Sequence, residues 1–443
     1  MLKTGPVDFI HQMQWTDLPE AAQRMTRLLV LDLLGVSASA RVTPLSRIIH
    51  DHAARHFGAG EGAGAASILF DDRRVSPAGA ALAGGMTIDA IDGHDGWRPC
   101  KGHAGANVLP ATLALAEAEG LMDGKGFLAA VALGYEFGCR VAVAQHGTVA
   151  DYHTSGSWGA VGCAAVGARM LGLDRDRTRE ALGIAEYHGP RSQMMRGVQH
   201  PTMVKDGSGW GAMAGVSSTY LAADGFTGAP AVTVEREDAS AWWQDLGNHW
   251  LMEEQYIKPY PVCRWTHGPL ACAEHLMKIH RVTHEQIERV EVESFLNMLS
   301  LATWKPETTE EAQYSVPYPL ATLIVNGAIG PGEVMGEALT DPDVLRLAET
   351  MVLTEDPALT GEFPQARKAR VVFLMKDGRR LESPVMEPLG DPERPLSEDQ
   401  IRAKFRDWAS PVIGSDRAGR IETAVDRLER DGLAPLLAEL GGL

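Results

Sequence analysis

DAIDGHDGWRPCKGHAGANVLP, residues 89–110, is the most unusual segment of the chain, and the expected architecture follows from it. Its first fifteen residues include three aspartates, two histidines, one arginine and one lysine, with three glycines between them. Neither the period of an amphipathic helix nor that of a half-buried strand is present. Because the apolar run ATLALAEAEG follows at residues 111–120, we expect a polar, glycine-hinged loop that leads into the N-terminus of a buried helix.

The same arrangement recurs twice further along the chain. Asp and Gly clusters before helices are often only turns and caps, so one such loop would not indicate a site. A second polar loop at residues 150–155 leads into GSWGAVGCAAVGARMLGL, residues 156–173, and Lys205-Asp206 leads into GSGWGAMAGVSSTYLAADG, residues 207–225. Because helix N-termini favour negative charge, we expect these loops to build a site for an anionic ligand.

The region up to about residue 262 predicts many helices and almost no strand alternation. The two glycine-rich segments need a reason to be helical, since each interior glycine costs about 1 kcal/mol relative to alanine. Close approach of neighbouring helices is the reason we expect. Glu136 and Arg140 are spaced i, i+4 on another predicted helix, and we interpret them as a structural ion pair.

The pattern changes after the proline-rich segment at residues 258–261. Alternating apolar residues at 289–295 and the run at 351–356 predict strands, and residues 369–385 predict a hairpin with an Asp-Gly turn. We therefore expect a mainly α protein with two domains. The predicted domains are a large all-helical domain, residues 1–264 with 396–443, and a smaller α+β domain, residues 265–395.

Composition limits the classes of function. The chain has 443 residues and a formal net charge of −17, so a nucleic-acid or anionic-membrane surface is not expected. An anionic small molecule would need a local basic pocket. The five cysteines include no CxxC pair, which argues against a disulfide framework and favours a reducing cytoplasm. We find no secretory signal pattern and no charge-free apolar run of membrane-spanning length.

The histidines of the polar loops are candidate acids and bases, because imidazole suits proton transfer near neutral pH. His103 closes the first loop, and His153 lies in the second. A lone histidine is more often structural, but these two each precede an apolar helix directly. We expect His103 and His153 to take part in the chemistry, and His94 is a candidate contact to the substrate.

Cationic residues in the same regions are candidate carboxylate ligands. Lys205 precedes a glycine-rich helix, and Lys258 and Arg264 lie in the proline-flanked segment KPYPVCRWTHG, residues 258–268. A guanidinium can bind a carboxylate through two parallel N–H bonds. The tyrosines of QYSVPYPLA, residues 313–321, lie in what we predict to be another loop, where one could donate to an enolate or fill the domain interface.

Other chemistries have weaker support. The chain contains no glycine-rich dinucleotide fingerprint and no phosphate-binding GxxxxGK[ST] motif. The carboxylates and histidines of residues 89–103 are of the type that binds a divalent metal, but no HExxH motif accompanies them. We therefore expect neither an organic cofactor nor a metal.

Several of these segments, in this order, resemble the MmgE/PrpD family, which includes 2-methylcitrate dehydratases, cis-aconitate decarboxylase and iminodisuccinate epimerase. The resemblance covers most of the chain. It is carried by DAIDGH with His103 and PATLALAEAEG, GYEFGCRV, YHTSGSWGAVGCAAVGARMLGLD with ALGIAEYHG, TMVKDGSGWGAMAG ending in DGFTG, KPYPVCRWTHG, and YSVPYPLA.

The resemblance implies a large helical domain and a smaller α+β lid, usually in a homodimer, with the site between the domains and no organic cofactor. Carried over motif by motif, the site would hold six residues: Asp92, His103, His153, Lys205, Lys258 and Tyr318. One segment departs from the family. Many members have two adjacent aspartates and then a threonine, whereas this chain reads Ile91-Asp92-Gly93-His94 and adds Arg98 and Lys101 before the histidine. These added cations leave room for a more highly charged substrate.

Reactions of this family share a carbanion beside a carboxylate. We expect His153 or Asp92 to remove the α-proton, and His103 or Tyr318 to protonate the leaving group or the opposite face. The predicted function is a lyase that dehydrates a hydroxy-tricarboxylate of the 2-methylcitrate type. The alternatives are a cofactor-independent epimerase of a polycarboxylate, a cis-aconitate-type decarboxylase and, outside catalysis, a helical scaffold that only binds carboxylates.

Overall fold

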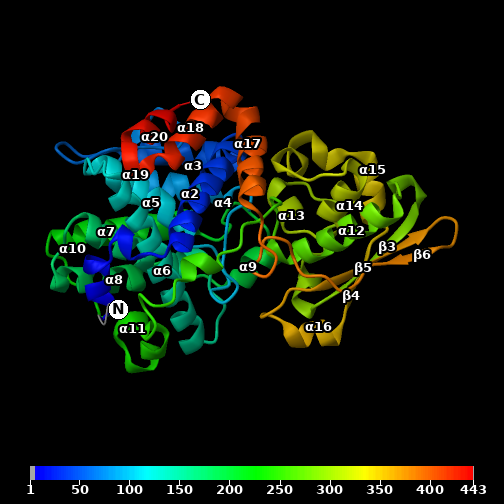
Figure 1. Cartoon of the computed structure of the whole chain (residues 1–443), viewed down its shortest axis with the longest axis horizontal. Coiled ribbons are helices and arrows are strands. Elements are labelled where there is room, and N and C mark those ends of the chain that lie inside the picture. Colours follow the sequence, from blue (N-terminus) through cyan, green and yellow to red (C-terminus); the bar gives the residue numbers. More distant parts are fainter. Residues whose placement is uncertain (1–4, 443) are drawn as a thin grey trace.

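The computed structural model describes residues 5–442, and its side chains form two main hydrophobic cores. The first core joins helices from residues 6–257 with the C-terminal helices, and we call this part the helical unit. The second core is formed mostly by residues 260–381, joined by Met194 and Val198, and includes a small sheet; we call residues 260–381 the α+β unit. Figure 1 shows the two units side by side, with α17 (Glu398–Ile413) between them.

The helical unit accounts for most of the chain. Its helices before the sheet are α1 (Pro6–Gln12), α2 (Glu20–Ala40), α3 (Pro44–His56), α4 (Pro77–Asp89), α5 (Gly105–Ala118), α6 (Gly124–Thr148), α7 (Ser155–Met170), α8 (Arg175–His188), α10 (Ser208–Ala223) and α11 (Val232–Glu235). A two-stranded ribbon, β1 (Ala66–Ser67) with β2 (Arg74–Val75), is its only paired strand element among the described residues. The expectation of a mainly helical region is confirmed.

The glycine-rich helices α7 and α10 pack closely against each other. A Cβ added at Gly211 would lie 2.4 Å from the carbonyl oxygen of Gly156, and one added at Gly215 would lie 2.4 Å from Cys163 Cβ. Only glycine allows the two backbones to approach this closely. The predicted reason for the glycines is therefore correct.

Helix α6 is long and apolar enough to cross a membrane, but 94% of its apolar window is buried inside the molecule. Helix α6 is therefore a core helix of the helical unit. Arg140 donates to the carbonyl oxygens of Trp242 and His249 at 3.0 and 2.9 Å, and Glu136 accepts from the Met252 backbone at 2.8 Å. Glu136 and Arg140 therefore connect α6 to residues 242–252, in agreement with their predicted structural role.

The C-terminal helices return to the helical unit. They are α17, α18 (Ser415–Asp426), α19 (Leu428–Asp431) and α20 (Ala434–Glu439), and their apolar side chains join the first core. Lys404 of α17 forms a buried ion pair with Asp32 of α2 at 2.7 Å. The spacing Ser-x-x-Gln at residues 397–400 predicts a capping box, and Ser397 and Gln400 form one at the start of α17.

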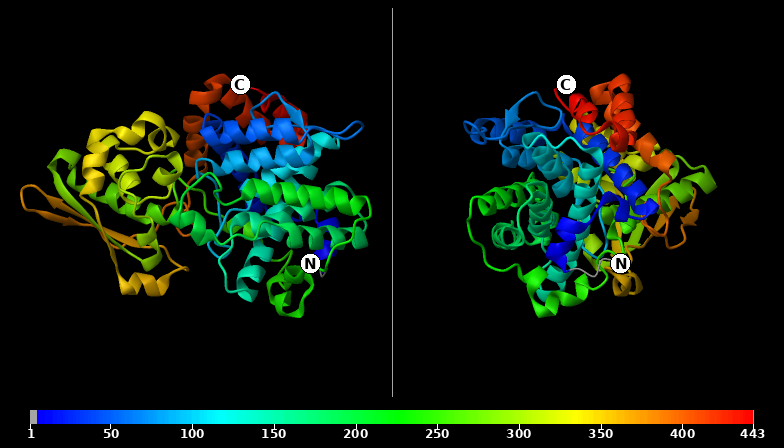
Figure 2. Two further views of the ribbon diagram at one scale, coloured as in Figure 1. Left: turned by 180° about the vertical axis from the view of Figure 1, so that it is seen from behind. Right: turned by 60° about the vertical axis from the view of Figure 1, so that its left-hand side comes forward.

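The α+β unit contains a four-stranded sheet of order β4-β3-β5-β6. Strand β3 is parallel to β4 and antiparallel to β5, which forms a hairpin with β6. Its elements are α12 (His267–His280), β3 (Ile287–Ser294), α13 (Thr309–Gln313), α14 (Pro317–Asn326), α15 (Pro342–Glu349), β4 (Val352–Glu355), α16 (Pro357–Glu362), β5 (Ala369–Met375) and β6 (Arg380–Glu382). Figure 2 shows α12, α14 and α15 gathered on one side of the sheet.

Helices α9, α13 and α14 were not predicted from the sequence. Residues 313–321 form the end of α13 and the first half of α14, because Pro317 supplies an N-terminal residue with no N–H to satisfy. Helix α9 (Met194–Gln199) places Met194 and Val198 in the second core, so this segment of the helical region packs against the α+β unit.

Candidate functional site

A narrow cavity lies where the two units meet. Its wall contains side chains from both units: Asp92, Lys101, His103, Tyr152, Met194, Val198, Asp206, Tyr256, Lys258, Cys263, Arg264, Trp265, Tyr314 and Arg367. Four of these side chains are cationic and two are carboxylates, so the wall has an excess of positive charge in a chain whose net charge is −17. This is the local basic pocket that an anionic ligand requires.

The cavity is built from loops that precede helices. Asp92, Lys101 and His103 come from the loop between α4 and α5, and Asp206 comes from the turn before α10. Three of the five non-glycine residues with positive φ in the described chain are Asp92, Lys101 and Lys205, at 48°, 55° and 48°. This conformation costs an L-residue roughly 1–2 kcal/mol, and such strain concentrates at functional sites.

Asp92 and Lys258 form a buried ion pair in the cavity wall. Lys258 Nζ donates to Asp92 Oδ1 and to the Asp92 carbonyl oxygen, both at 2.8 Å. Burial alone would raise the pKa of Asp92, but the ammonium groups of Lys258 and Lys205 outweigh burial and hold that pKa below its ordinary value. Asp92 is therefore a stable carboxylate that positions Lys258, and it is a weak base.

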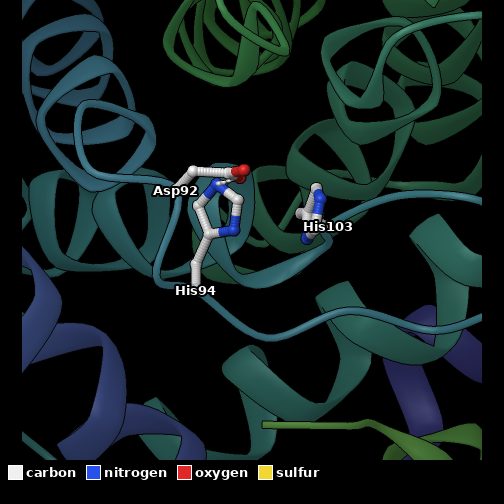
Figure 3. A group of neighbouring side chains, drawn as sticks. All are labelled: Asp92, His94 and His103. Carbon is white, nitrogen blue, oxygen red and sulfur yellow. Dashed lines mark ion pairs between the residues drawn. The ribbon is translucent and has the colours of Figure 1, made fainter. Parts of the chain in front are cut away.

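The rings of His94 and His103 lie beside this pair, with centroids 4.1 Å apart and planes tilted by 42°. Figure 3 shows Asp92 directed toward the ring of His94, with His103 next to it. Burial lowers the pKa of both histidines to about 3, with further contributions from Lys258. Both rings are therefore neutral near pH 7.

The hydrogen bonds of His103 define its tautomer. Its Nδ1 is in hydrogen-bond contact with the carbonyl oxygen of Asp95, so the ring proton lies on Nδ1 and Nε2 carries a lone pair. Nε2 lies 3.7 Å from Asp206 Oδ2. Burial raises the pKa of Asp206, although His103 opposes the shift. Ser155 connects the two, since its hydroxyl accepts from the His103 backbone at 3.0 Å and donates to Asp206 at 2.7 Å.

Arg264 lies on the opposite wall. It forms an ion pair with Asp391 at 2.9 Å, donates to the carbonyl oxygen of Leu389 at 2.9 Å, and lies 4.5 Å from the centroid of the Tyr256 ring. Lys101 has no such buried carboxylate, and its backbone carbonyl accepts from the Tyr152 hydroxyl at 2.7 Å. Both predicted cations therefore face the cavity with charge available to a ligand.

Lys205 lies next to the cavity. Its ammonium contacts the side-chain oxygen of Gln313 and lies 4.8 Å from the centroid of the Tyr314 ring. We expected the N-terminus of α10, just beyond Lys205, to attract a ligand carboxylate. The protein fills that position itself, because Asp89 accepts from the backbone and hydroxyl of Ser208 at 3.0 and 2.8 Å.

Besides Lys205 and His94, which lie beside the cavity without lining it, three predicted residues are placed elsewhere. The His153 ring is buried on the side of the loop that faces Arg191, and its neighbour Tyr152 takes the place in the wall. Tyr318 belongs to α14, and its hydroxyl donates toward the carbonyl oxygens of Glu333 and Ala338 at 2.8 and 2.9 Å. Arg98 forms an ion pair with Glu393 in a larger neighbouring cavity.

This larger cavity shares Lys101 and Tyr256 with the narrow one. We infer that it is the approach to the site, since the shared side chains form a common wall.

Asp92, His94 and His103 have ligand atoms within 4.8 Å of one another, which is the arrangement of a possible metal site. The contacts around them do not fit a cation well. Lys258 already places an ammonium on Asp92, and His103 Nδ1 contacts the Asp95 carbonyl. A divalent ion here would meet the repulsion of Lys258 at close range.

Several residues of the cavity were not assigned from the sequence. Asp206 lies beside Lys205 in the motif TMVKDGSGWGAMAG, so the sequence could have identified it as a candidate site residue. Tyr314 was one of the two tyrosines considered for the segment that contains Tyr318. Arg367 carried no signal, because QARKAR, residues 365–370, has the composition of an exposed charged loop.

Comparison with known families matches almost the whole chain. The MmgE/PrpD N-terminal domain matches residues 7–245, and the MmgE/PrpD C-terminal domain matches residues 260–430. The chain belongs to the MmgE/PrpD family. The resemblance inferred from the sequence is thereby confirmed.

The curated MmgE/PrpD relatives of this chain include decarboxylases. The cis-aconitate decarboxylase-like protein oryM of Aspergillus oryzae is 26% identical over 98% of this chain and 96% of its own length. The cis-aconitate decarboxylases of Mus musculus and Aspergillus terreus are 25% and 27% identical, over 97% and 95% of this chain and 91% and 92% of their own lengths. This similarity along the full length supports an enzyme of the MmgE/PrpD family.

Proposed function

We propose that the protein is a lyase that decarboxylates a small tricarboxylate of the cis-aconitate type. The observation that carries the proposal is the arrangement of neutral His103 and the ammonium of Lys258 on one cavity with an excess of cations. The full-length similarity to cis-aconitate decarboxylases favours decarboxylation over the other reactions of the family. The expected 2-methylcitrate dehydration remains a second candidate.

In this proposal the cations bind the substrate and stabilise the negative charge that develops. Loss of carbon dioxide breaks a carbon–carbon bond and leaves its electron pair on the substrate, where the neighbouring double bond and carboxylate delocalise it. Lys258 and Lys205 are the cations nearest the histidine pair. Fixed charges of this kind are usually the largest contribution to catalysis, and loss of one such donor costs about 10²–10³ in rate.

The carbanion must then take up one proton. We propose that the Asp206 carboxyl group, in its protonated form, passes its proton through His103 Nε2 to the carbanion and then takes up a proton from solvent, because Nε2 and Asp206 Oδ2 are 3.7 Å apart and burial raises the pKa of Asp206. The product has one carboxylate fewer and one additional C–H bond, so atoms and charge balance. Asp92 holds Lys258 in place and Asp95 fixes the His103 ring, and neither transfers a proton.

The departure at residues 91–94 favours the epimerase over the dehydratase among the other candidates. With Gly93 and His94 in place of a threonine hydroxyl, an elimination or an inversion at the α-carbon would also use His103 as its acid or base. Dehydration of a hydroxy-tricarboxylate and epimerisation of a polycarboxylate thus share the same proposed residues. The homodimer and the cytoplasmic location remain predictions, and the non-catalytic scaffold remains the alternative if no turnover occurs.

The proposal is tested by incubating the purified protein with cis-aconitate, 2-methylcitrate and other di-, tri- and tetracarboxylates in D₂O and recording NMR spectra. If the protein is a decarboxylase, we expect carbon dioxide and a product that carries one new C–D bond. Dehydration would produce an alkene with the same carbon skeleton, and epimerisation would introduce deuterium without forming an alkene. Binding without any turnover across the panel would contradict the enzymatic proposal.

A further inference from the structure

Arg367 is a buried cation in the cavity wall with no clear partner. It lies directly before β5, so it belongs to the α+β unit, and it is 5% exposed. Its Nε is buried and has no hydrogen-bond partner among the described residues. Its neighbours are the hydroxyl groups of Tyr256 and Tyr152, which are neutral, and Asp391, which is the one carboxylate that acts on its charge among the described residues. A buried guanidinium without a full set of partners is costly, so the arrangement calls for an anion.

Arg264 lies in the same wall in a similar state. Its Nε and Nη2 also lack hydrogen bonds of good geometry, although Nη2 lies 2.9 Å from Asp391 Oδ2. The other oxygen, Asp391 Oδ1, accepts no hydrogen bond from a described residue. The two buried guanidinium groups therefore share one carboxylate, that of Asp391. The three groups together carry a net positive charge. The other two carboxylates of the wall are engaged elsewhere, with Lys258 and Ser155.

Tyr256 connects the arginine side of the cavity to the loop that carries the histidines. Its ring lies against Arg264, and its backbone exchanges hydrogen bonds with Gly96 at 3.1 and 2.8 Å in the loop that carries His103. The arginines come from the side of the α+β unit, and Asp92 and His103 come from the helical unit. A ligand bound to both sides would span the cavity.

We propose that Arg367 and Arg264 form a separate carboxylate subsite, which binds a carboxylate of the substrate other than the one beside the reacting carbon. The planar guanidinium fork suits such a group, because it donates two parallel N–H bonds to a carboxylate. The subsite rests on the proposed function, since it assumes a polycarboxylate substrate. It makes Arg367 a specificity residue that selects molecules long enough to reach from Lys258 to the α+β unit.

The test uses tricarballylate, a saturated tricarboxylate, as a probe that binds without reacting. We expect Arg367→Gln and Arg367→Ala to raise its Kd by about 30-fold or more, which is the lower end of the usual effect of truncating one partner of a buried charge pair. Arg367→Lys keeps the charge but loses the fork, so we expect a smaller increase. Arg370→Ala is the matched control, because Arg370 pairs with Glu293 at the surface, and it should bind as the unmodified protein does.

The outcomes separate the subsite from the function. Partial recovery of binding by Arg367→Ala on addition of ethylguanidine would support the subsite, because a merely structural defect would not respond to that ion. Folded Arg367→Gln that binds tricarballylate as tightly as the unmodified protein would overturn the subsite and leave the proposed function standing. If the unmodified protein neither binds tricarballylate nor turns over any polycarboxylate, both proposals fail.

Discussion

Burial sets the protonation state of individual residues in this site. His103 is neutral because burial lowers its pKa to about 3, and the Asp95 carbonyl orients its ring so that Nε2 faces Asp206. The same burial raises the pKa of Asp206. A neutral imidazole with a free lone pair thus lies beside a carboxyl group whose pKa is raised, which suits proton transfer to a carbanion.

His103→Gln tests this arrangement at the level of one residue. Glutamine keeps a polar side chain but cannot relay a proton, so we expect kcat to fall by about 10²–10⁴. The measurement is steady-state turnover of the substrate that the NMR panel identifies. His280→Gln, at the exposed end of α12, is the control and should leave kcat unchanged. A fall of less than tenfold in a folded His103→Gln protein would argue against a role in proton transfer.

Asp95 gives a prediction about pH and stability. Burial raises its pKa to about 7, and the nearby Asp32 adds to the shift. Because the folded-state pKa lies above the unfolded value of 3.8, its contribution to stability is present at low pH and is lost as the pH rises through about 7. Asp95→Asn removes this titration. Relative to the unmodified protein, we expect it to gain about 2 kcal/mol in free energy of unfolding between pH 5.5 and 8.5.

Urea unfolding at the two pH values measures the difference. His103 remains held in the variant, because its partner is the Asp95 backbone carbonyl. A constant difference between the two proteins across this range would show that Asp95 does not titrate there.

The sequence allowed the candidate residues to be predicted where local chemistry marks them. Asp92, His103 and Lys258 stand out because a polar cluster or a proline-flanked lysine is unusual beside apolar helices. Arg367 could not be predicted, because its burial depends on contacts with Tyr256 and Tyr152 that are distant in the chain. The orientation of the His153 ring could not be predicted either, because it depends on the conformation of its loop.

Among the elements, α17 has the clearest connection to the site. Lys404 of this helix pairs with Asp32 at 2.7 Å and donates to the Gly93 carbonyl at 2.8 Å. Trp408 packs on Gly93, where an added Cβ would lie 2.4 Å from the ring. A C-terminal helix therefore supports the loop that carries Asp92 and His94. The capping box predicted the start of α17, but nothing local predicted these contacts.

Lys404→Met tests this support. The change leaves Asp32 buried without its partner, so we expect the free energy of unfolding to fall by about 3–5 kcal/mol and turnover to fall with it. Arg406→Met on the same helix is the matched control, since Arg406 is exposed and pairs only with Glu422; it should cost less than about 1 kcal/mol. Equal effects of the two substitutions in urea unfolding would contradict the supporting role of Lys404.

On the scale of the whole molecule, the site exists because two hydrophobic cores meet around it. The change of pattern near residue 260 allowed a helical and an α+β region to be predicted. The side chains that face each other across the boundary could not be predicted, since they depend on how the two units dock. Arg98 and Glu393 form an ion pair across the larger cavity that leads to the site.

Glu393→Gln tests whether this cavity is the approach. Glu393 is half exposed, so its loss should change stability by less than about 1 kcal/mol. A carboxylate about 10 Å from a trianion repels it by roughly 0.4 kcal/mol per charge in water, so we expect kcat/KM to rise about two- to fivefold at low ionic strength. The increase should disappear in high salt, and Glu398→Gln should show none. An unchanged kcat/KM at low salt would place the entrance elsewhere.

The most direct test of the account is a crystal structure of His103→Gln with the substrate identified by NMR. We predict a single substrate molecule in the cavity between the two units, with one carboxylate at Lys258 and another at Arg264 and Arg367. Its reacting carbon should lie beside residue 103. Substrate bound outside this cavity, or a cavity that stays empty in crystals saturated with substrate, would contradict the claim that these loops form one catalytic site.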